Sequence, residues 1–182
     1  MKKGTLLRDL ARVEQKLPEL IADSAGWQSL DINYEPPHVK RLWRDVVLDP
    51  EDDGLFHYRV CLHQILPCMA ALFHPHPWPS AVKILSGRYE MGLGDSATEI
   101  EPPMIATLVL AAGSSYEMVH PDGWHSVRPL DEPSYSLMIM AAPFATRHRG
   151  EKRPEGKLEP LSPTDAANLL GWFARFYLQR TR

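Results

Sequence analysis

Apolar residues recur at helical spacing near both ends of the chain. The first stripe consists of Leu6, Leu10, Val13 and Leu17. This period predicts a helix over residues 5–22, interrupted near Pro18. A second helix is predicted over residues 162–179, because Ser162 has a side chain that caps helices and Pro163 suits the first helical position. Each helix has one apolar face, so we expect both to cover another surface of the protein.

The stretch from about residue 38 to 146 has a different pattern, in which short apolar and aromatic runs alternate with turn signals rich in Gly, Pro and Asp. The expected strands lie at residues 39–45, 55–62, 69–76, 81–85, 88–93, 105–111, 116–119, 124–128 and 134–141. The chain has 17 prolines, which favours many short elements joined by tight turns. Such spacing is typical of a β-sandwich or β-barrel, so a mainly β fold with flanking helices is predicted.

Composition favours a single domain over residues 1–182. Hydrophobic residues make up 44% and charged residues 24%, the balance of an ordinary soluble globular protein. The net charge is -3, and no basic stripe or cluster favours nucleic acid or an anionic membrane. Charged residues near the start interrupt any apolar leader, so neither a secretion signal nor a membrane span is expected. Cys61 and Cys68 lack a CxxC spacing and are expected to be free thiols of a cytoplasmic protein.

Three histidines stand in positions that favour metal binding. His74 and His76 are two residues apart, and alternate side chains of a strand point to the same face. His125 follows the turn signal at residues 121–123 and opens another expected strand. Three imidazoles on one interior face would leave open positions on Fe(II), Ni(II), Cu(II) or Zn(II). The alternative is three unrelated structural histidines.

The surroundings of these histidines resemble the two motifs of the cupin superfamily. His74-Pro75-His76 through Gly87 is similar to the first motif, and the stretch from Gly113 to His125 is similar to the second. The resemblance implies a single cupin jelly-roll β-barrel that binds a metal. Two departures are visible. Trp124 alone separates the turn glycine from His125, where the usual motif has two residues, and Ser80 or Ala81 replaces the usual glutamate ligand.

Within the cupins, the chain resembles the cysteine dioxygenase-like branch, whose iron sits on three histidines. The resemblance covers roughly residues 74–144 and includes the runs 123–127 and 132–137. Members of that branch place a serine, a histidine and a tyrosine near the iron. Ser136 keeps the serine, whereas Met138 and Met140 stand where the histidine and tyrosine would be. A cysteine that some members crosslink to this tyrosine would fall at Ser80 or Ala81 and is absent.

Further site residues are proposed beside the metal ligands His74, His76 and His125. Tyr116 and His120 are candidates for protonating the substrate, although His120 could equally be a solvated turn residue or a fourth ligand. The candidates for substrate binding are Arg59, Trp78, Met138 and Met140. The resemblance gives Arg59 the role of a carboxylate-binding arginine, and Trp78 could also be ordinary core. Glu117 is a weaker candidate for a ligand.

The leading functional hypothesis is a non-haem Fe(II) dioxygenase that acts on a small-molecule substrate together with dioxygen. Ni or Zn in the same site would instead suit an isomerase or a hydrolase. A cupin that binds a metal or ligand without catalysis is the remaining alternative, favoured by the absence of the family's histidine and tyrosine. The resemblance to cupins also implies a homodimer, since exposed strand edges invite pairing.

Overall fold

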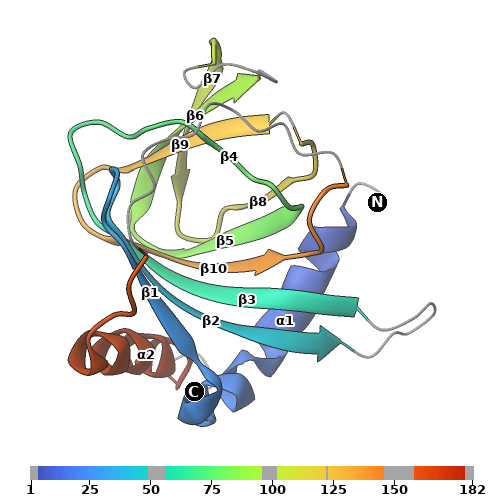
Figure 1. Ribbon diagram of the computed structural model, residues 1–182, viewed down its shortest axis with the longest axis vertical. Coiled ribbons are helices and arrows are strands. Elements are labelled where there is room, and N and C mark those ends of the chain that lie inside the picture. The colour runs from blue at the N-terminus through green and yellow to red at the C-terminus, as the bar shows by residue number, and fades with distance from the viewer. Residues whose placement is uncertain (1–3, 49–55, 96–101, 122, 146–157, 179–182) are drawn as a thin grey trace.

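The computed structural model describes residues 4–48, 56–95, 102–121, 123–145 and 158–178. The helical elements are α1 (Thr5–Ala22), the short 3-10 helix η1 (Ser24–Gly26) and α2 (Pro163–Leu178). The strands are β1 (Gln28–Ile32), β2 (Val39–Leu48), β3 (Phe56–Ile65), β4 (His74–Pro75), β5 (Ser80–Ser86), β6 (Arg88–Asp95), β7 (Met104–Ala111), β8 (Ser115–Met118), β9 (Gly123–Pro129) and β10 (Ser134–Met140). Figure 1 shows both long helices on the side of the molecule away from β6, β7 and β9.

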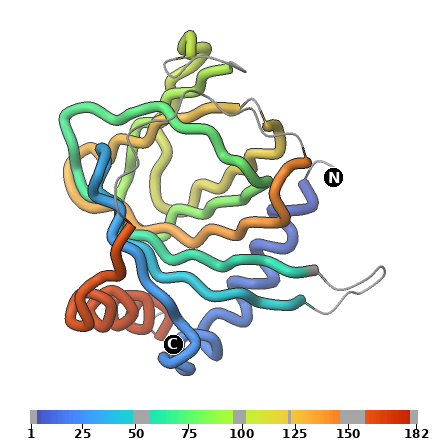
Figure 2. Tube along the Cα trace, viewed as in Figure 1, coloured from blue at the N-terminus to red at the C-terminus, as the bar shows by residue number. Residues whose placement is uncertain are grey.

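Two antiparallel sheets form the body of the molecule. The larger has the order β1-β2-β3-β10-β5-β8, and the smaller has the order β4-β9-β6-β7. From β3 onward, the chain passes back and forth between the two sheets. As a result β3-β10-β5-β8 faces β4-β9-β6-β7, which is the strand order of a jelly roll. The two sheets curve round a common interior (Figure 2). Among the described residues no strand pairing joins one sheet to the other, so the two sheets form a jelly roll without a closed barrel.

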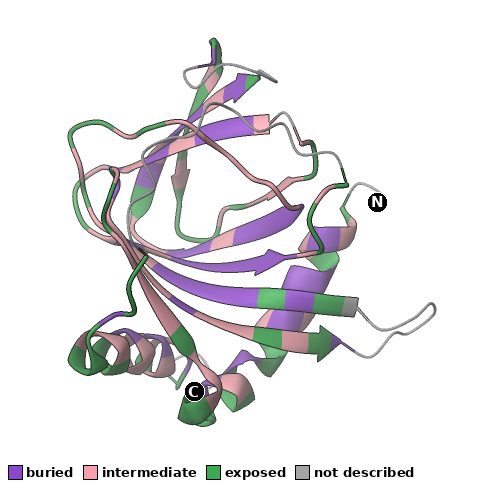
Figure 3. Ribbon diagram, in the orientation of Figure 1, coloured by how far each residue is buried: buried purple, intermediate pink, exposed green. Residues whose placement is uncertain are grey.

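The larger sheet is buried on both faces, because its side chains alternate between two different environments. Its outer face packs against α1 and α2, with α1 beside β5, β8 and β10 and α2 beside β2. The outward residues of β3 and β10 are Tyr58, Val60, Leu62, Leu137 and Ile139, and all are buried in this layer. The inward residues of the same strands are Cys61, His63, Ser136, Met138 and Met140, which face the smaller sheet. Figure 3 shows the resulting concentration of buried residues in the strands of the larger sheet.

Polar contacts fix α1 on this outer face. Asp9 is completely buried under the helix and accepts a 2.6 Å hydrogen bond from the hydroxyl of Tyr58. Arg8 and Arg12 also lie within ion-pairing distance of Asp9. Lys83 of β5 reaches Glu14 of the helix at 2.6 Å. A buried carboxylate is tolerated only when it is paired, so these contacts fix the position of the helix on the sheet.

Both predicted helices are confirmed, with one correction at Pro18. The α1 helix continues through Pro18 instead of being interrupted there, although a proline removes one backbone hydrogen bond. Leu17 and Ile21, on either side, are both buried, and this packing stabilises the turn that contains the proline. At α2 the Ser162 hydroxyl accepts a 3.0 Å bond from the amide of Asp165, as a capping residue should.

The cupin jelly-roll prediction is confirmed by the strand order, but two strand predictions were wrong in detail. Only His74–Pro75 is strand in the stretch predicted at residues 69–76. Met69 is 97% exposed, so the apolar composition of this stretch does not reflect burial. Strand β1 was not predicted, although polar and apolar residues alternate from Ser29 to Ile32; it pairs antiparallel with β2.

Replacing Tyr58 with phenylalanine should lower the free energy of unfolding by about 1–3 kcal/mol, because Asp9 then keeps its burial but loses a hydrogen-bond donor. Urea unfolding followed by circular dichroism measures the change. Asp131→Asn is a matched control, since it removes an ion pair whose partners Arg88 and Asp131 are 56% and 65% exposed. Equal effects of the two substitutions would contradict the role given to the buried pair.

Candidate metal centre

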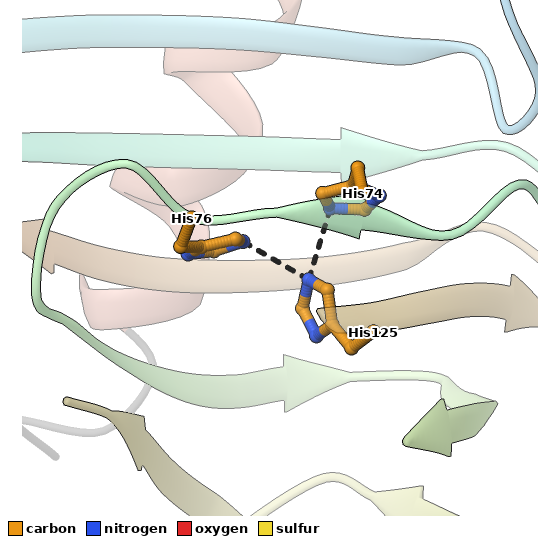
Figure 4. A group of neighbouring side chains, drawn as sticks. All are labelled: His74, His76 and His125. Atoms are coloured by element: carbon orange, nitrogen blue, oxygen red, sulfur yellow. Dashed lines mark hydrogen bonds between the residues drawn. The ribbon is translucent and has the colours of Figure 1, made fainter. Parts of the chain in front are cut away.

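A two-residue strand places the three histidines together. Strand β4 pairs with β9, and in this register His74 lies directly opposite His125. His76 follows two residues after His74 and returns its side chain to the same interior space. The ligating nitrogens of the three side chains all lie within 4.8 Å of one another. Figure 4 shows one ring nitrogen of His125 directed toward both His74 and His76.

The distances between the nitrogens fit a shared cation. His125 Nε2 lies 2.9 Å from His74 Nε2 and 3.0 Å from His76 Nε2. Two nitrogen donors that each stand about 2.1 Å from one ion, at a right angle, are about 3.0 Å apart. Protons alone satisfy this arrangement poorly, because a neutral ring nitrogen either donates one hydrogen or accepts with one lone pair. His125 Nε2 has two such contacts, and one metal ion would satisfy both.

The electrostatic surroundings keep the rings of His76 and His125 neutral, as metal ligands must be. Burial, with smaller contributions from His74 and the Arg41 guanidinium, lowers the pKa of His76 to about 3. Burial also lowers the pKa of His125 well below its ordinary value. The Nδ1 of His76 lies 2.8 Å from the hydroxyl of Ser80, which orients the ring so that Nε2 faces the other histidines. Ser80 thus stands at the usual glutamate position and supports a ligand instead of being one.

A cavity of about 330 Å³ opens beside the three histidines. Its walls come from both sheets, with β2, β3, β5 and β10 on one side and β6 and β9 on the other. Apolar lining is supplied by Ile65, Val82, Val127 and Met138. This volume suits a small organic molecule, and the apolar walls limit the access of water to the histidines.

A polar group on the opposite wall is formed by Arg41, His63 and Ser136, which are paired neighbours on β2, β3 and β10. Arg41 Nε donates to His63 Nε2 at 2.7 Å. The other ring nitrogen of His63 lies 3.5 Å from the Ser136 hydroxyl. Burial, together with the charge of Arg41, lowers the pKa of His63 well below its ordinary value. His63 is therefore neutral and accepts the hydrogen from Arg41.

Several residues predicted for the site do line the cavity. Tyr116, Trp78 and Met138 are all on its wall, and the ring of Tyr116 lies 6.2 Å from that of His125. The indole nitrogen of Trp78 is buried without a hydrogen-bond partner among the described residues. Met140 is buried in an apolar cluster with Met138 but is not part of the cavity wall.

Arg59 and His120 lie elsewhere. The guanidinium of Arg59 is held by Asp45 at 2.9 Å and stacks on Trp43 at 3.9 Å. It shares the inward face of β3 with His63 but stands four residues nearer the end of the sheet, beyond the cavity wall. His120 is exposed in the turn between β8 and β9 and does not line the cavity. Glu117 points to the opposite face of β8 from Tyr116 and accepts a 2.6 Å bond from the amide of Gly4.

Three cavity residues were not predicted from the sequence: Arg41, His63 and Tyr89. A signal for Arg41 was present in strand β2. Arg41 is two residues from both Val39 and Trp43 and so shares their face of the strand. A charged side chain therefore stands on the apolar face. His63 has the same parity as Cys61 and Ile65, which marks it as an inward residue in the same way. Tyr89 carries no comparable signal.

Comparison with known proteins gives structural likeness but no sequence relative. No protein-family model matches the chain, and no curated protein matches it in sequence. Among solved structures, the chain is similar to hydroxypropylphosphonic acid epoxidase from S. wedmorenis, with 14% identity and a TM-score of 0.44 over 64% of this chain and 56% of that chain. It is also similar to KdgF from Halomonas sp., with 14% identity and a TM-score of 0.40 over 64% of this chain and 87% of that chain.

A third similar structure is the cupin domain of Schizosaccharomyces pombe Cnp3, with 13% identity and a TM-score of 0.37 over 58% of this chain and 61% of that chain. The chain thus spans little more than half the length of the epoxidase. Together, the strand order and the histidine cluster define a jelly-roll protein with a candidate three-histidine metal site. No helix in the described part of the chain is long and apolar enough to cross a membrane.

The buried neutral histidines predict an acid-sensitive fold when metal is absent. Unfolded histidine binds a proton below about pH 6.5, whereas His63 and His125 in the folded protein do so only at much lower pH. Between these values the unfolded state binds more protons, so the free energy of unfolding should fall as pH falls. The slope should reach about 1.4 kcal/mol per pH unit for each such histidine.

Urea unfolding of metal-free protein at pH 7.5, 6.5, 5.5 and 4.5 tests this expectation. His63→Phe should reduce the slope, because it removes one of these groups while keeping an apolar ring in the wall. A free energy of unfolding that does not change between pH 7 and pH 5 would show that the histidines are not buried and neutral.

Proposed function

We propose that this protein is a metal-dependent enzyme, of the non-haem Fe(II) oxygenase type, that acts on a small anionic molecule with an apolar body. One observation carries the proposal. Three imidazoles converge on one side of a cavity, and Arg41 lines the same cavity. Among the described residues, no carboxylate lies within ion-pairing distance of Arg41.

His74, His76 and His125 would hold the metal through their Nε2 atoms. A metal ion held by three protein ligands would keep open coordination positions, which is the chemistry that an oxygenase requires. Neutral ligands leave the charge of the ion uncompensated, which favours an anionic substrate. Ser80 keeps the ring of His76 in the orientation that this arrangement requires.

Arg41 would bind the anionic group of the substrate. Its Nε donates to His63, which leaves the terminal nitrogens of the guanidinium to a ligand. His63 and Ser136 hold the side chain in place from the neighbouring strands, so little side-chain entropy is lost on binding. The unpartnered indole N–H of Trp78 is a further donor on the wall, and it also favours a ligand that carries hydrogen-bond acceptors.

The apolar part of the cavity wall favours a substrate whose body is apolar. Met138 lies where the resembled branch has a histidine, and with Ile65, Val82 and Val127 it makes this part of the cavity apolar. We therefore do not extend thiol oxidation from the resemblance to this chain.

The presence of Met138 in place of the histidine also favours the second candidate function, a cupin that binds a metal and a ligand without catalysis. A Zn- or Ni-dependent hydrolase or isomerase is the third candidate. The homodimer and the cytoplasmic location stay predictions.

The metal content of the purified protein tests the proposal that the three histidines bind a metal ion. Protein purified without an affinity tag and loaded anaerobically with Fe(II) should retain close to one equivalent, and His76→Ala should retain almost none. His57→Ala, which removes an exposed histidine of β3 outside the cluster, should bind as the wild type does. Equal iron content in wild type and His76→Ala would contradict the site. Dioxygen uptake with a panel of small carboxylates then separates an oxygenase from the two other candidates.

The substitution Arg41→Met tests the proposal that Arg41 binds the anionic group of the substrate. With Co(II) as an optical probe in the metal site, butyrate should bind about tenfold more weakly to this variant than to the wild type, because a charged hydrogen bond is lost. The stoichiometry of Co(II) should not change. Arg59→Met is the matched control, since that arginine is paired with Asp45 away from the cavity. A larger effect of Arg59→Met than of Arg41→Met would overturn the assignment of the anion site.

A further inference from the structure

Two tyrosines with no role in the function proposed above bridge the two sheets inside the cavity. Tyr89 stands on β6 of the smaller sheet, and Tyr116 stands on β8 at the edge of the larger sheet. Their hydroxyl oxygens are 3.0 Å apart, and both side chains line the cavity. Tyr89 is 1% exposed, so its ring is fixed in the core. The pair thus places a hydroxyl group at a defined point between the sheets.

One hydrogen of this pair has no acceptor among the residues that the structure describes. Two hydroxyl groups carry two hydrogens, and the bond from Tyr89 to Tyr116 uses only one of them. Ile65, Ile84, Met91 and Val127 pack round Tyr89, and Tyr116 packs against the same cluster, with the ring of His125 6.2 Å away. The second hydrogen, on Tyr116, therefore points to a ligand or to water. A buried donor is costly to leave unpaired, which favours a ligand with an acceptor at this place.

The position of Tyr116 relative to the histidines is set by the strands. Tyr116 is the direct partner of Val82 on β5, and the turn after β8 leads into β9, which carries His125. The rings of Tyr116 and His125 are 6.2 Å apart and inclined at 65°. The spare hydroxyl hydrogen is thus on the His125 side of the cavity, whereas Arg41 lies with His63 and Ser136 on β2, β3 and β10.

We infer that Tyr116 donates a hydrogen bond to the ligand atom that is held next to the three histidines, and that Tyr89 is the positioning residue that aims this hydroxyl. The inference rests on the proposed function, since it needs a metal in the histidine site. Tyr116 acts as a donor and not as a base, because burial raises its pKa to about 12 and keeps the phenol protonated at neutral pH. Such a donor stabilises negative charge on the atom that it contacts.

The arrangement gives the cavity two separate recognition points. Arg41 binds one end of an anionic ligand, and Tyr116 contacts the end that lies at the histidines. Ser136 accepts from His63 Nδ1–H and keeps its own hydroxyl hydrogen, but it stands with Arg41 and His63, and Met138 and Val82 offer no hydrogen to a ligand. In this part of the wall the phenol of Tyr116 is therefore the donor best placed to distinguish a ligand with an acceptor atom at the metal from one without it.

Azide binding to the Co(II)-loaded protein tests the inference without any need for turnover. Azide is a small acceptor that gives an optical signal when it binds Co(II). Tyr116→Phe should weaken azide binding about tenfold, because one hydrogen bond to a charged group is lost. Tyr89→Phe keeps the hydroxyl of Tyr116 but removes the hydrogen bond that holds it in place. This variant should weaken azide binding about threefold and shift the optical band. Both variants should bind one equivalent of Co(II), as the wild type does.

Tyr135→Phe is the matched control. Tyr135 also has a hydroxyl bonded to a side chain, at 2.7 Å from Gln64, but its ring stacks on Trp172 of α2 outside the cavity. It should bind azide as the wild type does. Wild-type affinity in Tyr116→Phe would overturn the inference and leave the proposed metal centre standing, and so would loss of Co(II) from that variant, since the tyrosine would then act on the fold. Wild-type affinity and an unshifted band in Tyr89→Phe would overturn the positioning role. If the wild type itself bound no Co(II), the proposed function and the inference would fail together.

Discussion

Strand β4 is only two residues long, yet the candidate site depends on its antiparallel pairing with β9. This pairing sets His74 directly opposite His125, and the alternation of side chains then returns His76 to the same space. Burial by the surrounding walls keeps His76 and His125 neutral and ready to bind a cation. A shift of one residue in this register would turn one of the ligands away from the others.

The double burial of the larger sheet makes the interior face available for function. Because α1 and α2 cover the outer face and form a large apolar core with it, the inner face does not have to be purely apolar. It can hold Arg41 and His63 beside apolar residues such as Val82 and Met138. A charged side chain there is favourable only with a partner, and the structure supplies one hydrogen bond to Arg41, from which we propose that a ligand supplies the rest.

The sequence was sufficient for the fold class, both helices and the three histidines, because each of these leaves a local pattern. The HxH spacing and the turn before His125 are visible within a few residues. The place of Arg41 on the cavity wall was not predicted, because which of two arginines faces the cavity depends on pairing between strands far apart in sequence. Arg59 shares the inward face of β3 with His63, but Asp45 holds it beyond the cavity wall, and Arg41 takes the place opposite His63. The bond between Tyr89 and Tyr116 joins two different sheets, and no local pattern could have predicted it.

X-ray absorption at the iron edge of Fe(II)-loaded protein tests the central claim most directly, because imidazole ligands give a characteristic scattering pattern from the outer atoms of the ring. The account predicts one iron ion with three imidazoles at about 2.1 Å, and fewer imidazoles in the spectrum of His125→Ala. A spectrum with one imidazole or none, unchanged by that substitution, would contradict the claim that His74, His76 and His125 bind a single metal ion.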